Sequence, residues 1–130
     1  MDIITAKRFY ATLTIGLRKG YTTESIAISA VYNELSRLQD LLIKEKQLYL
    51  SANCYESMII LSGHREPHLN IRFINYPRFS IEKQVFKTEV KLLAGQLMKV
   101  VNQNRVVIEF DDEILMIQES EEVDWRIGIE

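Results

Sequence analysis

Residues 9–17 alternate strictly between two kinds of side chain. Every odd position from Phe9 to Leu17 is apolar, while Tyr10, Thr12 and Thr14 all carry a hydroxyl group. Because successive side chains of a strand point to opposite faces, this pattern predicts a half-buried β-strand. The sheet that contains it must therefore bury one face and leave the other face to water or to a partner.

Two longer segments have helical spacing instead. The first is predicted to begin near Thr22–Glu24, where hydroxyl groups can cap a helix, and to end near Glu45. The second is predicted to begin after a capping Ser80 and to end at Asn102–Asn104. Their apolar residues recur at steps of three and four and form one stripe on each helix: Ile26, Ala27, Ala30, Val31, Leu35, Leu38, Leu41 and Leu42 in the first, and Ile81, Val85, Phe86, Val90, Leu93, Leu97 and Val101 in the second.

The remaining segments resemble strands. Residues 48–61 favour a strand with a bend near Tyr55, and a loop is expected at residues 63–67. Residues 69–76 predict another strand, which Pro77 ends because it lacks a donor and restricts the residue before it. Residues 106–110 and 114–117 flank an acidic turn and predict a final hairpin.

This order of elements predicts an α+β domain. Strand, helix, two strands, helix and strand form the split βαββαβ, ferredoxin-like arrangement, in which two helices cover one face of an antiparallel sheet. One extra C-terminal hairpin strand is expected. We predict a single domain over residues 1–118 and an acidic C-terminal tail over 119–130, which can add an edge strand through Trp125, Ile127 and Ile129.

Charge is distributed unevenly along the chain. Residues 1–108 contain fifteen Lys and Arg against nine Asp and Glu, whereas residues 109–130 contain nine acids and a single base, Arg126. The formal net charge of −2 therefore hides a basic body that can attract anions and an acidic end that can pair with it.

Composition narrows the compartment and the partners. No apolar run reaches the roughly 20 residues of a membrane span, and the N-terminus lacks the pattern of a signal peptide, so a cytoplasmic protein is expected. The single cysteine, Cys54, excludes an internal disulfide. A sheet with one open face is also typical of small proteins that assemble with copies of themselves. We therefore expect a homo-oligomer.

One segment concentrates the polar residues suited to binding. Residues 63–79 contain both histidines, both prolines and three of the arginines. Guanidinium groups recognise phosphate or carboxylate with forked donors, and the amide and phenol groups nearby supply neutral donors. We therefore predict a site for a small anionic ligand, with a nucleotide as one candidate, formed by Arg65, His68, Asn75, Tyr76, Arg78 and Arg105. The competing interpretation is that these arginines pair with the acidic tail.

Metal and polymer partners fit the sequence less well. His64, Glu66 and His68 stand two residues apart, so an extended backbone would place all three on one face, as a zinc site requires. Pro67 and Arg65 argue against that site, and a polar turn is the simpler interpretation. A duplex-binding protein should show a continuous basic stripe and an overall excess of positive charge. This chain shows neither, so nucleic acid is not an expected partner. We expect no cofactor.

The patterns of known catalytic sites are weak. The acidic turn at Glu109, Asp111, Asp112 and Glu113 can hold magnesium, although acids in tight turns are usually structural. Cys54 would need a histidine beside it to act as a nucleophile. Residues 16–20 have two glycines but no Walker ending, which leaves only a weak anion cradle before the first helix.

The sequence thus favours a non-enzymatic homo-oligomer that binds a small anionic ligand near residues 63–79. The first alternative is a structural or adaptor protein of the kind that phages and mobile elements encode, in which the arginines and the acidic tail serve assembly. The second alternative is a metal-dependent hydrolase that uses the histidines or the acids of the hairpin.

Overall fold

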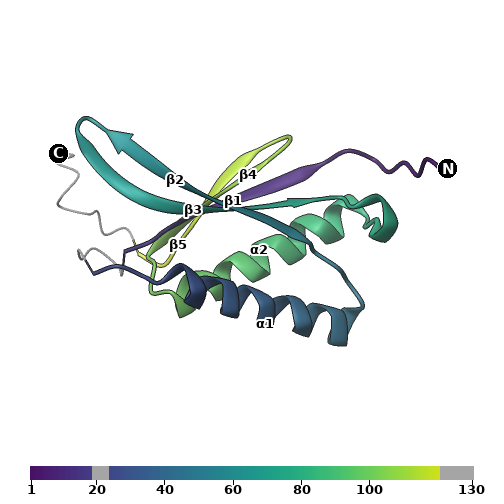
Figure 1. The fold of residues 1–130 in the computed structure, drawn as a ribbon, viewed down its shortest axis with the longest axis horizontal. Helices are drawn as coiled ribbons and strands as arrows, with labels where there is room; N and C mark the ends of the chain where they lie inside the picture. The colour runs from purple at the N-terminus through teal and green to yellow at the C-terminus, as the bar shows by residue number, and fades with distance from the viewer. Residues whose placement is uncertain (19–23, 121–130) are drawn as a thin grey trace.

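The structure is a computed structural model that describes residues 1–18 and 24–120. Five strands and two helices follow one another in the order β1, α1, β2, β3, α2, β4, β5, with a short 3₁₀ helix, η1, before α2 (Figure 1). Their bounds are β1 Tyr10–Gly16, α1 Ile28–Lys46, β2 Ala52–Leu61, β3 His64–Ile74, η1 Pro77–Phe79, α2 Lys83–Val100, β4 Arg105–Phe110 and β5 Ile114–Gln118.

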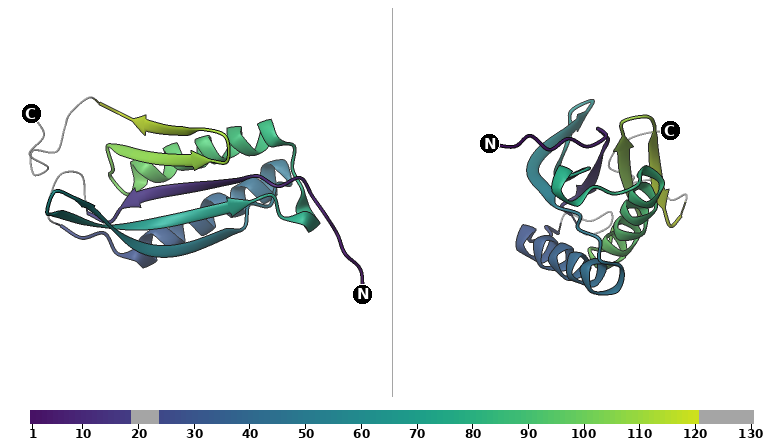
Figure 2. Two further views of the ribbon diagram at one scale, coloured as in Figure 1. Left: turned by 90° about the horizontal axis from the view of Figure 1, so that it is seen from above. Right: turned by 90° about the vertical axis from the view of Figure 1, so that its right-hand side faces the viewer.

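The strands form one antiparallel sheet in the order β2-β3-β1-β4-β5, and both helices lie on the same side of it (Figures 1 and 2). The order of the first four strands in the sheet, β2-β3-β1-β4, is that of the ferredoxin-like split βαββαβ fold. β5 is the extra hairpin strand beyond β4. The predicted α+β fold class is therefore confirmed.

The core lies between the helices and one face of the sheet. In β1 the alternating residues Ala11, Leu13 and Ile15 are fully buried there, as the sequence pattern predicts. They meet the apolar stripes of the two helices, because each stripe turns toward the sheet. The largest fully buried side chains are Phe73, Phe86, Leu13, Ile15, Leu69, Ile71, Leu97, Met98, Ile108, Val31, Val90 and Val106.

The helices begin later than the sequence predicted. The first starts at Ile28, after an N-cap at Ala27 that makes no side-chain hydrogen bond, so the expected start at residues 22–24 is wrong. The second starts at Lys83, because the carboxylate of Glu82 accepts a 3.0 Å hydrogen bond from the backbone N–H of Val85. Ser80, the predicted cap, instead ends η1.

The hairpin of β2 and β3 differs most from the expectation. Residues 63–67, predicted as a loop, are the turn residue Gly63 and the first part of β3. The turn itself has only Ser62 and Gly63, with φ values of 49° and 85°, which are the left-handed conformations of a tight two-residue hairpin turn.

Pro67 fits within this strand because of where β1 ends. The carbonyl of Pro67 accepts a 3.0 Å hydrogen bond from the N–H of Leu17, one residue beyond β1. The missing N–H of Pro67 faces the same side, where the β1 ladder has already ended, so no ladder bond is lost. Among the described residues, β2 is the only strand that pairs with residues 64–67, and this end of the hairpin extends past β1 (Figures 1 and 2).

No helix among the described residues is long and apolar enough to cross a membrane. The predicted edge strand of the acidic tail, at Trp125, Ile127 and Ile129, lies outside the described residues.

Candidate functional site

The face of the sheet away from the helices, called the open face here, is largely polar. The strand registers place cross-strand partners on the same face, so Thr12 and Thr14 of β1 lie beside Arg72 and Asn70 of β3. The open face is formed by Asn53, Tyr55, Ser57, Ile59 and Leu61 of β2; His64, Glu66, His68, Asn70, Arg72 and Ile74 of β3; Tyr10, Thr12, Thr14 and Gly16 of β1; Arg105, Val107 and Glu109 of β4; and Ile114, Met116 and Gln118 of β5.

A hydrogen-bond network joins three strands at the centre of the open face. The amide of Asn70 accepts from the hydroxyl of Thr14 at 3.0 Å and donates to Ser57 Oγ at 2.7 Å. Asn70 is only 8% exposed although it faces away from the core. A buried amide with satisfied donors and acceptors holds its neighbours in one arrangement, so this network makes a rigid polar floor.

A carboxylate lies beside this floor, at the hairpin end of the sheet. The side chain of Glu66 is 19% exposed, and its Oε2 lies 3.8 Å from Nε2 of His64. A Cβ atom added to Gly16 would lie 3.3 Å from Glu66 Oε1 and 2.9 Å from Gln103 Oε1. Only a glycine at position 16 therefore lets both side chains approach the β1 backbone without a shift. We call Gly16, His64, Glu66, His68 and Gln103 the glutamate site.

The glutamate site contains an unsatisfied polar atom. Nε2 of His64 is buried and has no hydrogen-bond partner among the described residues. Nδ1 of His68, in contrast, lies 3.0 Å from the backbone carbonyl of Glu66. A buried polar group without a partner costs free energy, so the orphaned nitrogen beside Glu66 is a place where a bound molecule can add a hydrogen bond.

The six residues predicted as an anion site fall into three locations. Arg65 and His68 lie in the hairpin part of β3, but Arg65 points to the opposite face and is exposed. Tyr76 and Arg78 follow the other end of β3, roughly 30 Å away along the strand at about 3.3 Å per residue. The structure therefore does not gather these arginines into one hollow, because the segment that joins them in sequence is a long strand.

The residues after β3 are largely engaged with one another. Asn75 is buried; its amide donates to the carbonyl of Lys7 at 2.9 Å and accepts from the N–H of Ile81 at 2.9 Å. The ring of Phe79 lies beside that of Tyr76, with centroids 6.1 Å apart, and under the guanidinium of Arg78 at 5.6 Å. Asn75 thus anchors the N-terminal segment before β1 and the connection between η1 and α2.

Arg105 lies at the hairpin end of the sheet. Continuing the antiparallel register of β1 and β4 by two residues places it opposite Gly16, which pairs with His68 on the other side. Its guanidinium donates to Gln118 Oε1 at 2.9 Å and to the carbonyl of Ser120 at 3.3 Å. Of the six predicted residues, His68 and Arg105 therefore share one end of the sheet with Glu66.

The three candidate zinc ligands share one face of a strand but do not converge on one point. His64, Glu66 and His68 do share one face of an extended strand. However, no group of three or more His, Cys, Asp or Glu residues in the described part of the chain could hold a metal ion. Since His68 turns toward its own backbone, the three side chains do not converge.

The acids of the β4–β5 turn pair with lysines of α2. Lys83 Nζ lies 3.1 Å from both Asp111 Oδ2 and Asp112 Oδ2. Lys87 Nζ lies 2.7 Å from Asp112 Oδ1 and 3.4 Å from Glu113 Oε1. Two ammonium groups thus occupy the position that a magnesium ion would need, so the turn fixes the hairpin to α2 rather than offering a metal site.

This lysine clamp predicts a loss of stability in acid. Hydrogen bonds from Lys87 and Lys83 lower the pKa of Asp112 from 3.8 to about 2. A lowered folded-state pKa stabilises the fold above the unfolded value and loses that effect as pH falls through the folded value. We expect the free energy of unfolding to decline between about pH 4 and pH 2, and Asp112→Asn to show a smaller decline in urea titrations.

Glu56→Gln is the matched control, because Glu56 is an exposed carboxylate on β2 that takes no part in this clamp. A decline with pH that is the same in Asp112→Asn as in the unmodified protein would contradict the role of the clamp.

Cys54 is not placed for nucleophilic catalysis. It pairs with Ile71 and faces the helices, whereas His64 and His68 lie on the open face. Burial also raises the pKa of the Cys54 thiol, which disfavours the reactive thiolate. The side chain acts as a small part of the core. The predicted anion cradle at residues 16–20 lies partly outside the described residues, and α1 begins only at Ile28.

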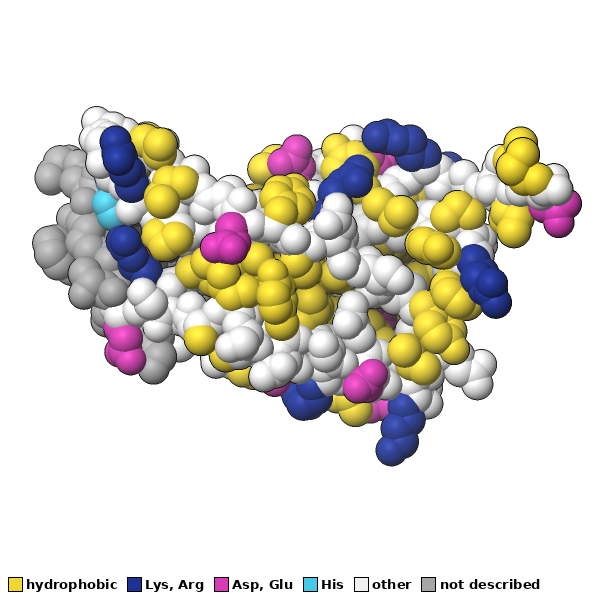
Figure 3. All heavy atoms as spheres, viewed as in Figure 1, with side chains coloured by type: hydrophobic (Ala, Val, Ile, Leu, Met, Phe, Trp, Pro, Cys, Tyr) yellow, Lys and Arg dark blue, Asp and Glu magenta, His cyan; other side chains and the backbone are white. Residues whose placement is uncertain are grey.

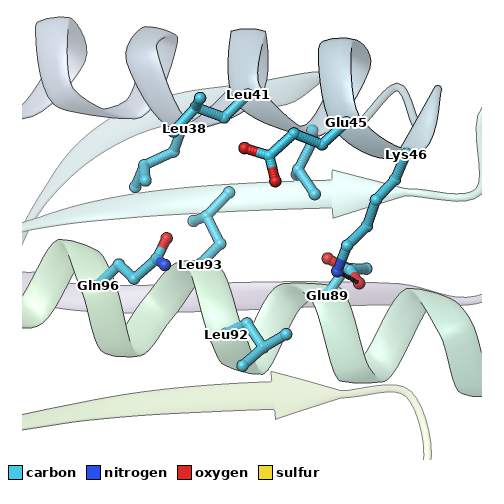
Figure 4. Close-up of a pocket in the computed structure, with 9 residues that line it drawn as sticks. Leu38, Leu41, Glu45, Lys46, Glu89, Leu92, Leu93 and Gln96 are labelled. Atoms are coloured by element: carbon cyan, nitrogen blue, oxygen red, sulfur yellow. Dashed lines mark hydrogen bonds and ion pairs between the residues drawn. The ribbon is translucent and has the colours of Figure 1, made fainter.

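A separate apolar groove of about 120 Å³ lies between α1 and α2 (Figure 4). Leu38, Leu41 and Leu93 extend into it, and at one end Lys46 Nζ lies 2.5 Å from Glu89 Oε1. These two charges satisfy each other across the helices. The groove thus offers less polar chemistry for recognition than the open face.

Local sequence patterns do not identify several of the site residues. In the sequence, Gly16 is one of a pair of glycines, and Gln103 lies in the segment that ends the second predicted helix. The side chains of Glu66 and Gln103 approach Gly16 from 50 and 87 positions along the chain, which no local pattern reveals. A detectable signal was the run of polar residues at every second position of β3, from His64 to Arg72, which marks the face that is not core.

Comparisons with known proteins show a shared fold. The structure resembles a phage SAM lyase in its apo state, with a TM-score of 0.66 and 17% identity over 88% of this chain and 91% of that chain. It also resembles a phage SAM lyase in complex with S-methyl-5′-thioadenosine, with a TM-score of 0.65 and 17% identity over 95% of this chain and 98% of that one. No protein-family model matches the chain, and no curated protein matches it in sequence. At 17% identity, the likeness shows the fold alone.

Proposed function

We propose that this protein is a lyase that binds S-adenosylmethionine on its open face at the glutamate site and releases S-methyl-5′-thioadenosine. The observation that carries the proposal is the half-enclosed carboxylate of Glu66 beside the unsatisfied Nε2 of His64. The same fold, over nearly the whole chain, belongs to a phage SAM lyase that holds S-methyl-5′-thioadenosine. This replaces the non-enzymatic anion-binding protein that the sequence favoured.

The chemistry of the ligand fits the groups on the open face. S-adenosylmethionine has a sulfonium and an ammonium group, both of which are attracted to a carboxylate and to an aromatic ring. Glu66 supplies the carboxylate, and Tyr55, 45% exposed on the neighbouring strand, supplies a ring. A ring of this kind can also stack on the adenine. The rigid Asn70 network between them provides a fixed floor for the ribose.

The proposed reaction breaks the bond between the sulfonium sulfur and the four-carbon amino-acid side chain. The sulfur leaves with the bonding electrons as a neutral thioether. The carbon fragment is completed either by attack of its own carboxylate, which gives a lactone, or by loss of a β-proton to a base, which gives an alkene. Glu66 can hold the ammonium group in the first route and accept the proton in the second.

We further propose that the protein works as a homo-oligomer. Met58, Ile59, Ile60 and Leu61 are adjacent in the hairpin and are between 44% and 62% exposed. Figure 3 shows hydrophobic side chains on the surface at this end of the molecule, next to basic ones. Ile59 and Leu61 lie on the open face and Met58 and Ile60 on the opposite face, so this end of the hairpin exposes apolar side chains on both sides. A cluster of exposed apolar side chains favours burial against another copy. A partner seated there would also enclose the neighbouring glutamate site.

The test is to incubate the purified protein with S-adenosylmethionine and separate the products by chromatography. We expect S-methyl-5′-thioadenosine to accumulate in proportion to the protein added. The lactone and the alkene are isomers of equal mass, so the proton NMR spectrum of the four-carbon product, in which only the alkene has vinyl signals, tells them apart. Light scattering on the same sample should give a multiple of the 15.2 kDa chain mass. Absence of the thioether, with no change in melting temperature on adding either compound, would refute the proposed function.

A further inference from the structure

A second hollow lies at the opposite end of the sheet from the glutamate site. It is formed where the N-terminal segment enters β1 and where the chain leaves β3 toward η1, two segments that Figure 1 shows at the same end of the molecule. Its volume is about 300 Å³, within the range of small-molecule sites. Lys7, Arg8 and Arg72 line it together with Tyr10 and Asn75, and no lining residue is acidic.

The two arginines are held by the same aromatic ring. The guanidinium carbon of Arg72 lies 4.9 Å from the ring centroid of Tyr10, and that of Arg8 lies 5.7 Å from it. Contact with the ring face orients a guanidinium group while leaving the N–H donors at its edge available. The lysine and arginine ion pairs described above and on α1 use other cations, namely Arg37, Lys46, Lys83 and Lys87.

The backbone of this hollow is fixed before any ligand binds. Asn75 donates from its side chain to the carbonyl of Lys7 at 2.9 Å, and its backbone N–H donates to the carbonyl of Phe9 at 3.2 Å. These bonds hold the segment that bears Arg8 against the end of β3 that bears Arg72. Binding therefore does not need to order the backbone, which removes a main cost of association.

We propose that this hollow binds the phosphate group of a small phosphorylated molecule. Two guanidinium groups over one ring and a nearby ammonium group repel one another, and an anion among them relieves that repulsion. Phosphate suits the arrangement better than a single carboxylate, because it carries more charge and offers more acceptor oxygens to two forked donors. Three cations at one hollow, without a continuous basic stripe, favour a small molecule over a nucleic-acid polymer.

The hollow is distinct from the glutamate site and does not depend on the proposed lyase activity. Arg72 and Glu66 lie six residues apart on the same face of β3, which corresponds to roughly 20 Å along the strand. A phosphate bound at one position therefore does not contact the other. A mutation that abolishes the lyase activity should leave phosphate binding intact, and a mutation that abolishes phosphate binding should leave the lyase activity intact.

The experiment is a calorimetric titration of the full chain with inorganic pyrophosphate at low ionic strength. We expect saturable binding that weakens as salt is added, because the contacts are charged and partly exposed. Arg72→Gln and Arg8→Gln should each weaken binding roughly tenfold or more, as removal of a charged hydrogen-bonding group does. Lys44→Gln, an exposed lysine of α1 outside the hollow, is the charge-matched control and should change affinity less than about twofold.

The result remains interpretable if one variant is unstable. Arg8 precedes the first strand, so Arg8→Gln should keep the melting temperature of the unmodified protein even if Arg72→Gln does not. Failure of pyrophosphate to bind, or equal binding by the unmodified protein and Arg8→Gln, would overturn the proposal. Citrate that binds as tightly as pyrophosphate would overturn its phosphate preference. Much tighter binding of a single-stranded oligonucleotide would overturn the assignment to a small molecule.

Discussion

Replacing Phe86 by alanine is expected to lower the free energy of unfolding by about 3–5 kcal/mol. Phe86 of α2 is fully buried and meets the ring of Phe9 edge-to-face, with centroids 4.9 Å apart and planes at 62°. Truncation removes this contact and leaves a cavity between α2 and the sheet. Since domains of this size are stable by only about 5–15 kcal/mol, urea titrations should show a much lower midpoint.

The control for this effect is Val85→Ala, the preceding position on the same helix. Val85 is 41% exposed, so its truncation should change the free energy of unfolding by only about 0.5 kcal/mol. A loss in Phe86→Ala no larger than that in Val85→Ala would contradict the placement of α2 on the sheet.

Replacing Glu66 by glutamine is expected to have the largest effect on function. The kcat/KM for release of S-methyl-5′-thioadenosine should fall at least roughly a hundredfold, as it does when a group that positions charge or moves a proton is lost. The affinity for S-methyl-5′-thioadenosine itself should change much less, because this thioether has neither the sulfonium nor the ammonium group. Chromatographic rates and calorimetric titration measure the two quantities separately.

Glu56→Gln is the matched control for Glu66→Gln. Glu56 lies in the same hairpin but pairs with Leu69 and points to the opposite face, so the reaction should proceed at the unmodified rate. An unmodified rate in Glu66→Gln would remove Glu66 from the site. Equal losses of rate and of thioether affinity would show that Glu66 binds the adenosyl part rather than the cation.

The fold could be predicted from sequence because its strongest patterns coincide with its buried faces. In β1 every second residue is buried, and most of each helical stripe faces the core, so period and burial largely agree. Leu41 and Val85, predicted as members of the stripes, are instead 37% and 41% exposed because they lie at the edge of each stripe. The predicted loop at residues 63–67 is wrong, because glycine and proline usually mark loops but here belong to a tight turn and a strand. A proline is acceptable in β3 because β1 ends at Gly16, so the missing N–H of Pro67 has no ladder partner to lose. This depends on how the two strands align in the folded protein, which the local sequence does not show.

The candidate site was harder to predict for a related reason. Nearness in sequence between Arg65 and Arg78 suggested one pocket, but an extended strand separates residues by about 3.3 Å each. The residues that do meet, Gly16, Glu66 and Gln103, come from three separate segments. Likewise, Arg72 joins Arg8 at the ring of Tyr10 only because β1 and β3 pair. Tyrosine and arginine spacing along the chain contains no trace of that pairing.

The location of the ligand on the open face is the central claim, and amide chemical-shift mapping with S-methyl-5′-thioadenosine tests it most directly. We predict saturable shifts at the open-face residues Thr14, Gly16, Ser57, Glu66 and Asn70, with little change along the outer surfaces of α1 and α2. Shifts confined to the groove between the helices, around Leu41 and Leu92, or no shifts at saturating concentration, would contradict the account.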